Sequence, residues 1–357
     1  MSHAHTEKKP LDDASTEFLA RELGTSSLSI LQLAGDASHR RYYRVVVGDH
    51  SYVLMMWDPF QDDGRYPFLN VRSHFAKHAV RVPDVIAKAP ELGLVLLEDL
   101  GDLTLERKFW ENQNQSMAVP YYEQAIDELI KIHYSASNDR QGGCVAFEIA
   151  FDTDKLLWEM NYGREHLIEK LAGVSLSRTE RAELDRIFLD ICTRLDQQEK
   201  RICHRDYHSR NLMIKFGQVR VIDFQDARMG PIQYDLVSLV HDSYVDMNET
   251  MRGQILDYYI KRADEIRVST LGLKPIGRNQ FDSVFQLQMI QRCFKACGSF
   301  ASFYNMREDT RYLKYIKPTL KKVVETLEPF TQYRSFFELI QNRGLLDFNY
   351  LNPTQIS

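Results

Sequence analysis

The sequence is poor in cysteine and lacks any long apolar run. Five cysteines occur among 357 residues, at positions 144, 192, 203, 293 and 297. An odd, scattered set argues against a disulfide framework and predicts a reducing compartment, which we take to be the cytoplasm. No apolar segment approaches the roughly 20 residues of a membrane span, and the amino terminus lacks the apolar core of a signal peptide. We therefore predict no membrane partner, and we expect the polar residues 1–10 to be disordered.

Positive charge is not in excess either. The formal net charge is −5 and no run of lysine and arginine is present, so nucleic acid is not an expected partner. The apolar fraction of 44% is ordinary for a globular protein. At this length the chain can form two lobes with a sizeable core. Nothing in the pattern indicates an oligomeric state.

The most informative polar residues lie between positions 204 and 226. Asp206 and Asn211 are five residues apart in a short loop, and Asp223 follows Asn211 by twelve. Residues 212–222 read as two short strands turning at Gly217, and such a hairpin returns the chain to its start. We therefore expect Asp223 beside Asn211. A free carboxylate that can act as a base, and a pair of oxygen ligands suited to Mg²⁺, are the parts that phosphoryl transfer requires.

These residues resemble the catalytic and metal-binding loops of the kinase superfamily. Residues 204–211 read His-Arg-Asp-Tyr-His-Ser-Arg-Asn, and residues 223–226 read Asp-Phe-Gln-Asp. His208, and Asp-Phe-Gln-Asp in place of Asp-Phe-Gly, are typical of the aminoglycoside phosphotransferase branch. The resemblance implies ATP and Mg²⁺ as cofactors, Asp206 as the catalytic base, and Asn211 and Asp223 as metal ligands. It also implies that His204 and Asp235 support the loop structurally.

A turn of small residues near the amino terminus is a second candidate region. Residues 30–33 are predicted to form a strand, and residues 34–38 read Ala-Gly-Asp-Ala-Ser before a returning strand. Small residues let backbone N–H groups approach an anion. Alone, such a turn is weak evidence, but ahead of a kinase-type loop it is the expected counterpart of the glycine-rich loop. Ser38, Arg40 and Arg41 are the predicted phosphate-binding residues.

The sequence departs from the kinase pattern at one ion pair. Kinases carry a phosphate-binding lysine on the next strand and an acidic partner on the following helix. Here residues 51–57 contain no lysine, and the predicted helix at 68–78 contains no glutamate. One reading is lost activity. The reading we favour is that an arginine replaces the lysine, since arginine can hold phosphate bidentately, and the candidates are Arg40, Arg41 and Arg72.

The resemblance implies an α+β, two-lobed fold similar to that of protein kinases. Residues 1–100 are predicted to form a small antiparallel lobe that covers the nucleotide, and residues 101–357 a mostly helical lobe. Residues 98–102 resemble the hinge that reads adenine through backbone groups, with Glu98 and Leu100 as predicted contacts. Periodicity and capping signals predict helices at 13–23, 68–78, 120–134, two within 152–197, then 249–266, 279–299, 309–328 and 331–342.

Substrate residues are expected on two of these helical segments. Helices inserted ahead of the catalytic loop, as at 152–197, build a substrate pocket in small-molecule kinases of the aminoglycoside type. Glu159 in this insertion could accept a sugar hydroxyl, or it could be a solvated or paired side chain. Arg292 and Lys295, three residues apart, share one helix face. They could hold an acidic substrate group or form a solvated basic face.

Longer matches narrow the expected function. Residues 35–45, 204–213 and 222–239 are similar to the kinases that phosphorylate the anomeric hydroxyl of N-acetylmuramate and N-acetylglucosamine in peptidoglycan recycling, and that group also lacks the strand lysine. The resemblance implies an ATP-dependent sugar kinase with a small-molecule sugar as its partner. One alternative is a kinase of another small molecule such as an aminoglycoside, which two cations in the pocket would disfavour. The other is a non-catalytic nucleotide-binding regulator, suggested by the missing ion pair.

Overall fold

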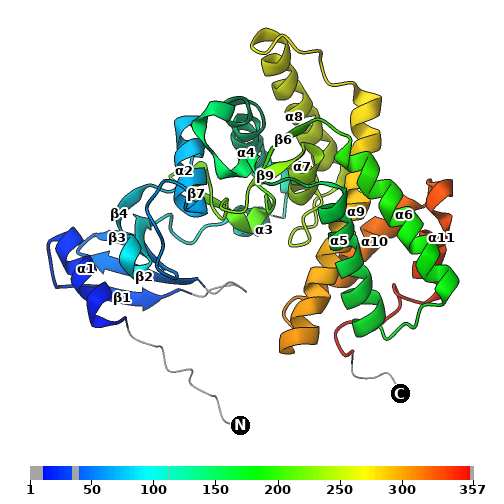
Figure 1. The fold of residues 1–357 in the computed structure, drawn as a ribbon, viewed down its shortest axis with the longest axis horizontal. Coiled ribbons are helices and arrows are strands. Elements are labelled where there is room, and N and C mark those ends of the chain that lie inside the picture. Colours follow the sequence, from blue (N-terminus) through cyan, green and yellow to red (C-terminus); the bar gives the residue numbers. More distant parts are fainter. Residues whose placement is uncertain (1–10, 34–39, 112, 354–357) are drawn as a thin grey trace.

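The structure is a computed structural model that describes residues 11–33, 40–111 and 113–353. The expectations for residues 1–10 and for Ser38 therefore lie outside the described residues. Figure 1 shows a small lobe built on a β-sheet and a larger, mostly helical lobe beside it. This arrangement is the predicted two-lobed α+β fold. No helix within the described ranges combines the length and the apolar character that crossing a membrane requires.

The small lobe is a five-stranded antiparallel sheet with the strand order β1-β2-β3-β5-β4. Because side chains alternate along a strand, Leu54 and Leu96 face helix α1, whereas Met55 and Val95 face helix α2. The core under α2 continues into the large lobe, so the two lobes share one buried interior. The elements are α1 (Asp13–Leu23), β1 (Ser29–Gln32), β2 (Arg41–Val47), β3 (His50–Met56), α2 (Pro67–Lys77), β4 (Val85–Ala89) and β5 (Leu94–Glu98).

The large lobe carries the catalytic segment on short strands between helices. Strand β6 pairs with β9, and β7 pairs with β8. The elements are α3 (Leu105–Trp110), α4 (Val119–Ile130), α5 (Thr153–Gly163), α6 (Arg178–Asp196), β6 (Lys200–Cys203), β7 (Leu212–Lys215), β8 (Gln218–Val221), β9 (Arg228–Pro231), α7 (Gln233–Val240), α8 (Glu249–Ser269), α9 (Arg278–Arg307), α10 (Ile316–Leu327) and α11 (Arg334–Asn342).

Some predicted helix boundaries are wrong. Helix α9 runs eight residues beyond its predicted end at 299, because apolar side chains such as Phe300 keep packing into the core. The helix predicted at 309–328 begins only at Ile316, after a short 3-10 turn. Helices α4 and α5 both continue into wider π-helical segments, Lys131–Ala136 and Arg164–Leu171. The capping box that begins α6, by contrast, is present as expected between Ser177 and Glu180.

A close helix crossing positions the predicted substrate residues. A Cβ atom added to Gly298 on α9 would lie 2.5 Å from the Cα atom of Gly163 on α5. Only glycines permit this approach, which brings the backbones of the two helices together. Figure 1 shows α5 and α9 side by side, facing the small lobe. The crossing therefore holds Arg292 and Lys295 on α9 close to Glu159 on α5.

Candidate active site

The loop of residues 204–211 is held from beneath by a buried carboxylate. Asp235 on α7 accepts hydrogen bonds from the backbone N–H groups of His204 at 2.6 Å and Arg205 at 3.0 Å. Arg205 has a φ of 86°, which a non-glycine residue rarely adopts without such support. The His204 ring lies 2.8 Å from the carbonyl oxygen of Ile222. The structural roles predicted for His204 and Asp235 are thus confirmed.

The hairpin that follows brings the predicted metal-ligand pair together. In it Leu212 lies opposite Val221. The side-chain amide of Asn211 donates to the Asp206 carbonyl oxygen at 2.9 Å and to Asp223 Oδ2 at 3.2 Å. With its N–H groups engaged in this way, Asn211 offers Oδ1 as its remaining polar atom. Two oxygen ligands of the kind that Mg²⁺ prefers therefore lie side by side, and their role as metal ligands stays a prediction.

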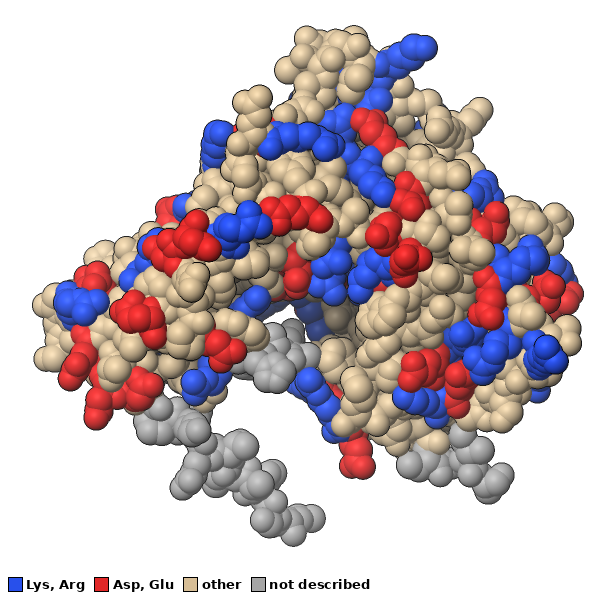
Figure 2. Space-filling view, in the orientation of Figure 1, with Lys and Arg blue, Asp and Glu red and all other residues tan. Residues whose placement is uncertain are grey.

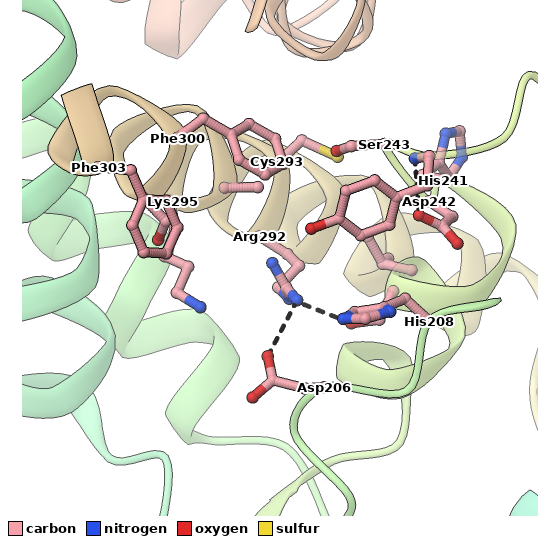
Figure 3. Close-up of a pocket in the computed structure, with 15 residues that line it drawn as sticks. Asp206, His208, His241, Asp242, Ser243, Arg292, Cys293, Lys295, Phe300 and Phe303 are labelled. Carbon is pink, nitrogen blue, oxygen red and sulfur yellow. Dashed lines mark hydrogen bonds and ion pairs between the residues drawn. The ribbon is translucent and has the colours of Figure 1, made fainter. Parts of the chain in front are cut away.

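The carboxylate of Asp206 faces a pocket between the catalytic loop and α9 (Figure 3). Its side chain is 27% exposed, so a substrate can reach it. Figure 2 shows the face of the molecule hollowed between the lobes, with lysine and arginine side chains around the hollow. The pocket is lined by Asp206, His208, Val237, Ser238, His241, Asp242, Ser243, Tyr244, Arg292, Cys293, Lys295, Ala296, Ser299, Phe300 and Phe303.

Neighbouring cations keep Asp206 ionised. Burial alone would raise its pKa, but Lys295, Arg205 and Arg292 together outweigh burial and hold the pKa well below the ordinary value for an aspartate. The Arg292 Nη2 atom lies 3.4 Å from Asp206 Oδ1. A carboxylate in this state is a weak base, so it acts on a hydroxyl mainly by accepting its hydrogen bond and orienting it.

The alternative of a solvated basic face is wrong for Arg292. The residue is only 9% exposed, and its Nε atom donates to Ser238 Oγ at 3.1 Å. Lys295, one helical turn further on, lines the same pocket and is partly exposed. In Figure 3 both charged groups point toward Asp206. The structure therefore brings Arg292 and Lys295 beside Asp206, which lies more than 80 positions earlier in the sequence.

The structure contradicts one of the two roles predicted for Glu159, the contact with a sugar hydroxyl. It is fully buried, and its Oε2 atom accepts hydrogen bonds from Gln291 at 2.9 Å and from Tyr234 at 3.3 Å. A side chain in this position does not contact a sugar hydroxyl. The alternative, a paired side chain, describes it correctly, and Glu159 supports the wall of the pocket behind α9.

The aromatic wall of the pocket was not predicted. Tyr244, Phe300 and Phe303 line it, and a sugar ring can pack its apolar face on such rings. The Arg210 guanidinium of the catalytic loop lies 3.6 Å from the centre of the Tyr244 ring. It donates two hydrogen bonds to the Glu106 carboxylate. The only signal in the sequence was the aromatic spacing on α9, which cannot be told from ordinary core packing.

The segment predicted to be the hinge carries its charged groups in ion pairs. The Glu98 carboxylate binds Lys215 at 2.8 Å, and the same ammonium donates to the Asp99 carbonyl oxygen at 2.8 Å. Asp99 is held by Arg44 through two hydrogen bonds of 2.6 and 3.0 Å. These pairs fix residues 98–100 against β2 and β7. Any adenine contact by Glu98 or Leu100 would therefore use backbone groups, and it stays a prediction.

The three arginines proposed to replace the missing lysine have different surroundings. Arg72 is wrong for this role, because it is tied to the carbonyl of Pro83 at 3.0 Å and to Asp84 at 2.5 Å. Arg41 is exposed and lowers the pKa of Asp12 at the start of α1, so it lies toward that helix. Arg40 differs from both.

Arg40 lies in an aromatic setting. Its guanidinium is 5.0 Å from the centre of the Trp57 ring. Burial raises the pKa of Tyr42, Arg40 lowers it and the Asp223 carboxylate raises it, so both charges act on this phenol. The Arg40 guanidinium also lowers the pKa of Tyr66, against the larger effect of burial. Of the three candidates, Arg40 is the one whose charge acts on the same phenol as the charge of Asp223.

Comparison with known proteins gives a family-level match. Residues 29–268 match the phosphotransferase enzyme family, which is two thirds of the chain. A protein of Neisseria meningitidis named N-acetylmuramate/N-acetylglucosamine kinase is 31% identical over 319 residues, which cover 87% of this chain and 91% of that one. A protein of the same name from Pseudomonas aeruginosa is 32% identical over 299 residues, which cover 83% of each chain.

Solved structures with a similar fold are more distant in sequence. A choline kinase from Streptococcus pneumoniae has a TM-score of 0.56 at 14% identity, covering 87% of this chain and 98% of that one. An aminoglycoside phosphotransferase bound to ADP has a TM-score of 0.55 at 14% identity, covering 88% and 99%. At this identity the likeness establishes the kinase-like fold alone.

Proposed function

The chain belongs to the phosphotransferase enzyme family, and from this premise we propose that it is an ATP-dependent sugar kinase acting on the anomeric hydroxyl of an N-acetylated amino sugar. The observation that carries the proposal is the pocket at Asp206, which is walled by aromatic rings and by two cations from α9. Relatives that match most of the chain bear the name N-acetylmuramate/N-acetylglucosamine kinase. An ATP-dependent reaction of this kind belongs in the cytoplasm, and its place there would be peptidoglycan recycling.

Asp206 is the proposed catalytic residue. Its carboxylate accepts the hydrogen bond of the attacking hydroxyl and takes the proton as the phosphoryl group transfers. The low pKa makes it a weak base, which suits a reaction in which positioning and electrostatics dominate. The anomeric hydroxyl is the most acidic hydroxyl of a reducing sugar, so it needs the least help from a base.

Asn211 and Asp223 are the residues that would hold Mg²⁺. Gln225 donates to Asp223 Oδ1 at 2.7 Å and so fixes the orientation of that carboxylate. When bound, the ion supplies neutralisation of the phosphate charge. Backbone groups of Glu98 and Leu100 are the proposed contacts of adenine.

Arg40 is the proposed replacement for the missing lysine. A guanidinium over the face of Trp57 keeps its planar fork, and its charge acts on Tyr42 together with the charge of Asp223. This assignment favours an active kinase over a non-catalytic regulator, because it restores a cation on the nucleotide side of the site.

A substrate panel tests the proposal. The purified protein is incubated with ATP, Mg²⁺ and, separately, N-acetylmuramate, N-acetylglucosamine, simple hexoses and an aminoglycoside, and ADP formation is followed. We expect turnover with the two N-acetylated sugars. Turnover with the aminoglycoside alone would support that alternative, and ATP binding without turnover on any acceptor would support the regulator.

A further inference from the structure

The two cations of α9 that reach the pocket have different surroundings. Arg292 is engaged by the protein itself: it donates to Ser238 Oγ at 3.1 Å, approaches Asp206 Oδ1 at 3.4 Å, and lies 5.5 Å from the centre of the Tyr234 ring. These contacts hold the guanidinium in one place whether or not a substrate is present. Arg292 is therefore suited to positioning the carboxylate of Asp206.

Lys295 has no such contacts. Within residues 11–33, 40–111 and 113–353 it forms no hydrogen bond and no ion pair, although it lines the pocket and points toward its centre (Figure 3). Glu159, whose charge acts on Lys295, is fully buried, and its Oε2 atom accepts hydrogen bonds from Tyr234 and Gln291. Leaving an ammonium partly buried and unpaired is costly, and the cost falls when an anion enters the pocket.

We propose that Lys295 recognises a carboxylate on the acceptor sugar and that Arg292 positions Asp206 for any acceptor. Since Lys295 and Asp206 line one pocket, the carboxylate and the reacting hydroxyl belong to one small molecule. N-acetylmuramate carries such a group on its lactyl ether, and N-acetylglucosamine does not. This inference rests on the proposed function, and it makes Lys295 the residue that sets the preference between the two sugars.

Steady-state kinetics with the two sugars tests the division of roles. Lys295→Met keeps the aliphatic stem and removes the charge. We expect KM for N-acetylmuramate to rise about 10- to 100-fold relative to KM for N-acetylglucosamine, the usual worth of one hydrogen bond to a charged group. We expect kcat with both sugars to fall alike, because a cation beside Asp206 is lost. Lys295→Arg should restore most of the preference. Lys317→Met, an exposed lysine on α10, is the matched control and should leave both constants unchanged.

The pH dependence gives an independent readout. Burial and then Arg292 lower the pKa of Lys295 to about 8, against the opposing effect of Glu159 and Asp206. Arg205 of the catalytic loop also faces it and acts in the lowering direction. An ordinary carboxylate or guanidinium does not titrate near this value. KM for N-acetylmuramate should therefore rise above about pH 8, while KM for N-acetylglucosamine stays level and Lys295→Arg abolishes the rise.

The failures are distinguishable. If wild-type protein phosphorylates both sugars and Lys295→Met changes both KM values equally, or neither, the carboxylate assignment is overturned while the kinase proposal stands. If wild-type protein phosphorylates neither sugar, the proposed function is overturned, and the carboxylate assignment with it.

Discussion

The two sides of this active site hold their charged groups by different means. On the large-lobe side, Asp206 and Asn211 sit in a loop whose backbone is bonded to buried Asp235. On the small-lobe side, the Arg40 guanidinium lies over the face of the Trp57 ring. In the first arrangement, backbone hydrogen bonds to Asp235 fix the position of the loop. The second arrangement needs only a cation that can reach the phosphates, and different elements of the small lobe can supply that cation.

Removing the metal-ligand carboxylate should have the largest effect. Asp223→Ala is expected to abolish turnover and to blunt the metal dependence of nucleotide binding, because the oxygen pair with Asn211 is broken. Activity and Mg²⁺ titrations of ADP binding measure both. Asp226→Ala is the control, since that carboxylate binds Arg205 at 2.9 Å instead. Turnover at the wild-type rate by Asp223→Ala would contradict the proposal that Asp223 is a metal ligand.

Asp206 gives the next largest expected effect. Asp206→Asn keeps the shape of the side chain but not its charge, so kcat should fall by about 10²- to 10⁴-fold, the usual range for a lost general base. ATP affinity, measured by calorimetry, should stay close to that of the wild type. Loss of ATP binding together with a lower thermal unfolding temperature would mark Asp206 as structural.

The small-lobe side is tested by three matched substitutions. Arg40→Ala should raise KM for ATP and lower kcat, each by about tenfold or more, because a charge-assisted contact to phosphate is lost. Arg41→Ala and Arg72→Ala should behave like the wild type in ATP kinetics. Wild-type ATP kinetics in all three variants would show that none of these arginines replaces the missing lysine. That result would support the alternative of a non-catalytic regulator.

The smallest expected effect is in the acid range of the pH profile. Burial raises the pKa of Asp206, but the positive charges of Lys295 and Arg205 lower it further, so it lies below the ordinary value near 3.9. The carboxylate therefore stays ionised as pH falls from 7 to 5, and kcat/KM for N-acetylglucosamine should show no loss assignable to this group. A decline with a midpoint near pH 6 that disappears in Asp206→Asn would contradict the low pKa.

The same contrast explains what the sequence could predict. The hairpin and the approach of Asp223 to Asn211 followed from spacing, because a two-stranded turn leaves the chain little choice. The capping box at Ser177 could also be predicted, because it depends on residues only three positions apart. The burial of Glu159 could not be predicted. Whether a helix residue faces a cleft or the core depends here on a helix crossing at Gly163 and Gly298, which lie far apart in the chain. Burial of Arg292 depends on that same packing.

The position of the transferred phosphate tests the proposed reaction most directly. Wild-type protein is given ATP, Mg²⁺ and N-acetylmuramate, and the product is identified by phosphorus NMR and a reducing-end assay. We expect a sugar 1-phosphate that has lost its reducing end, and a methyl glycoside of the same sugar should bind without reacting. Phosphate on another carbon, or transfer to the blocked glycoside, would contradict the anomeric assignment.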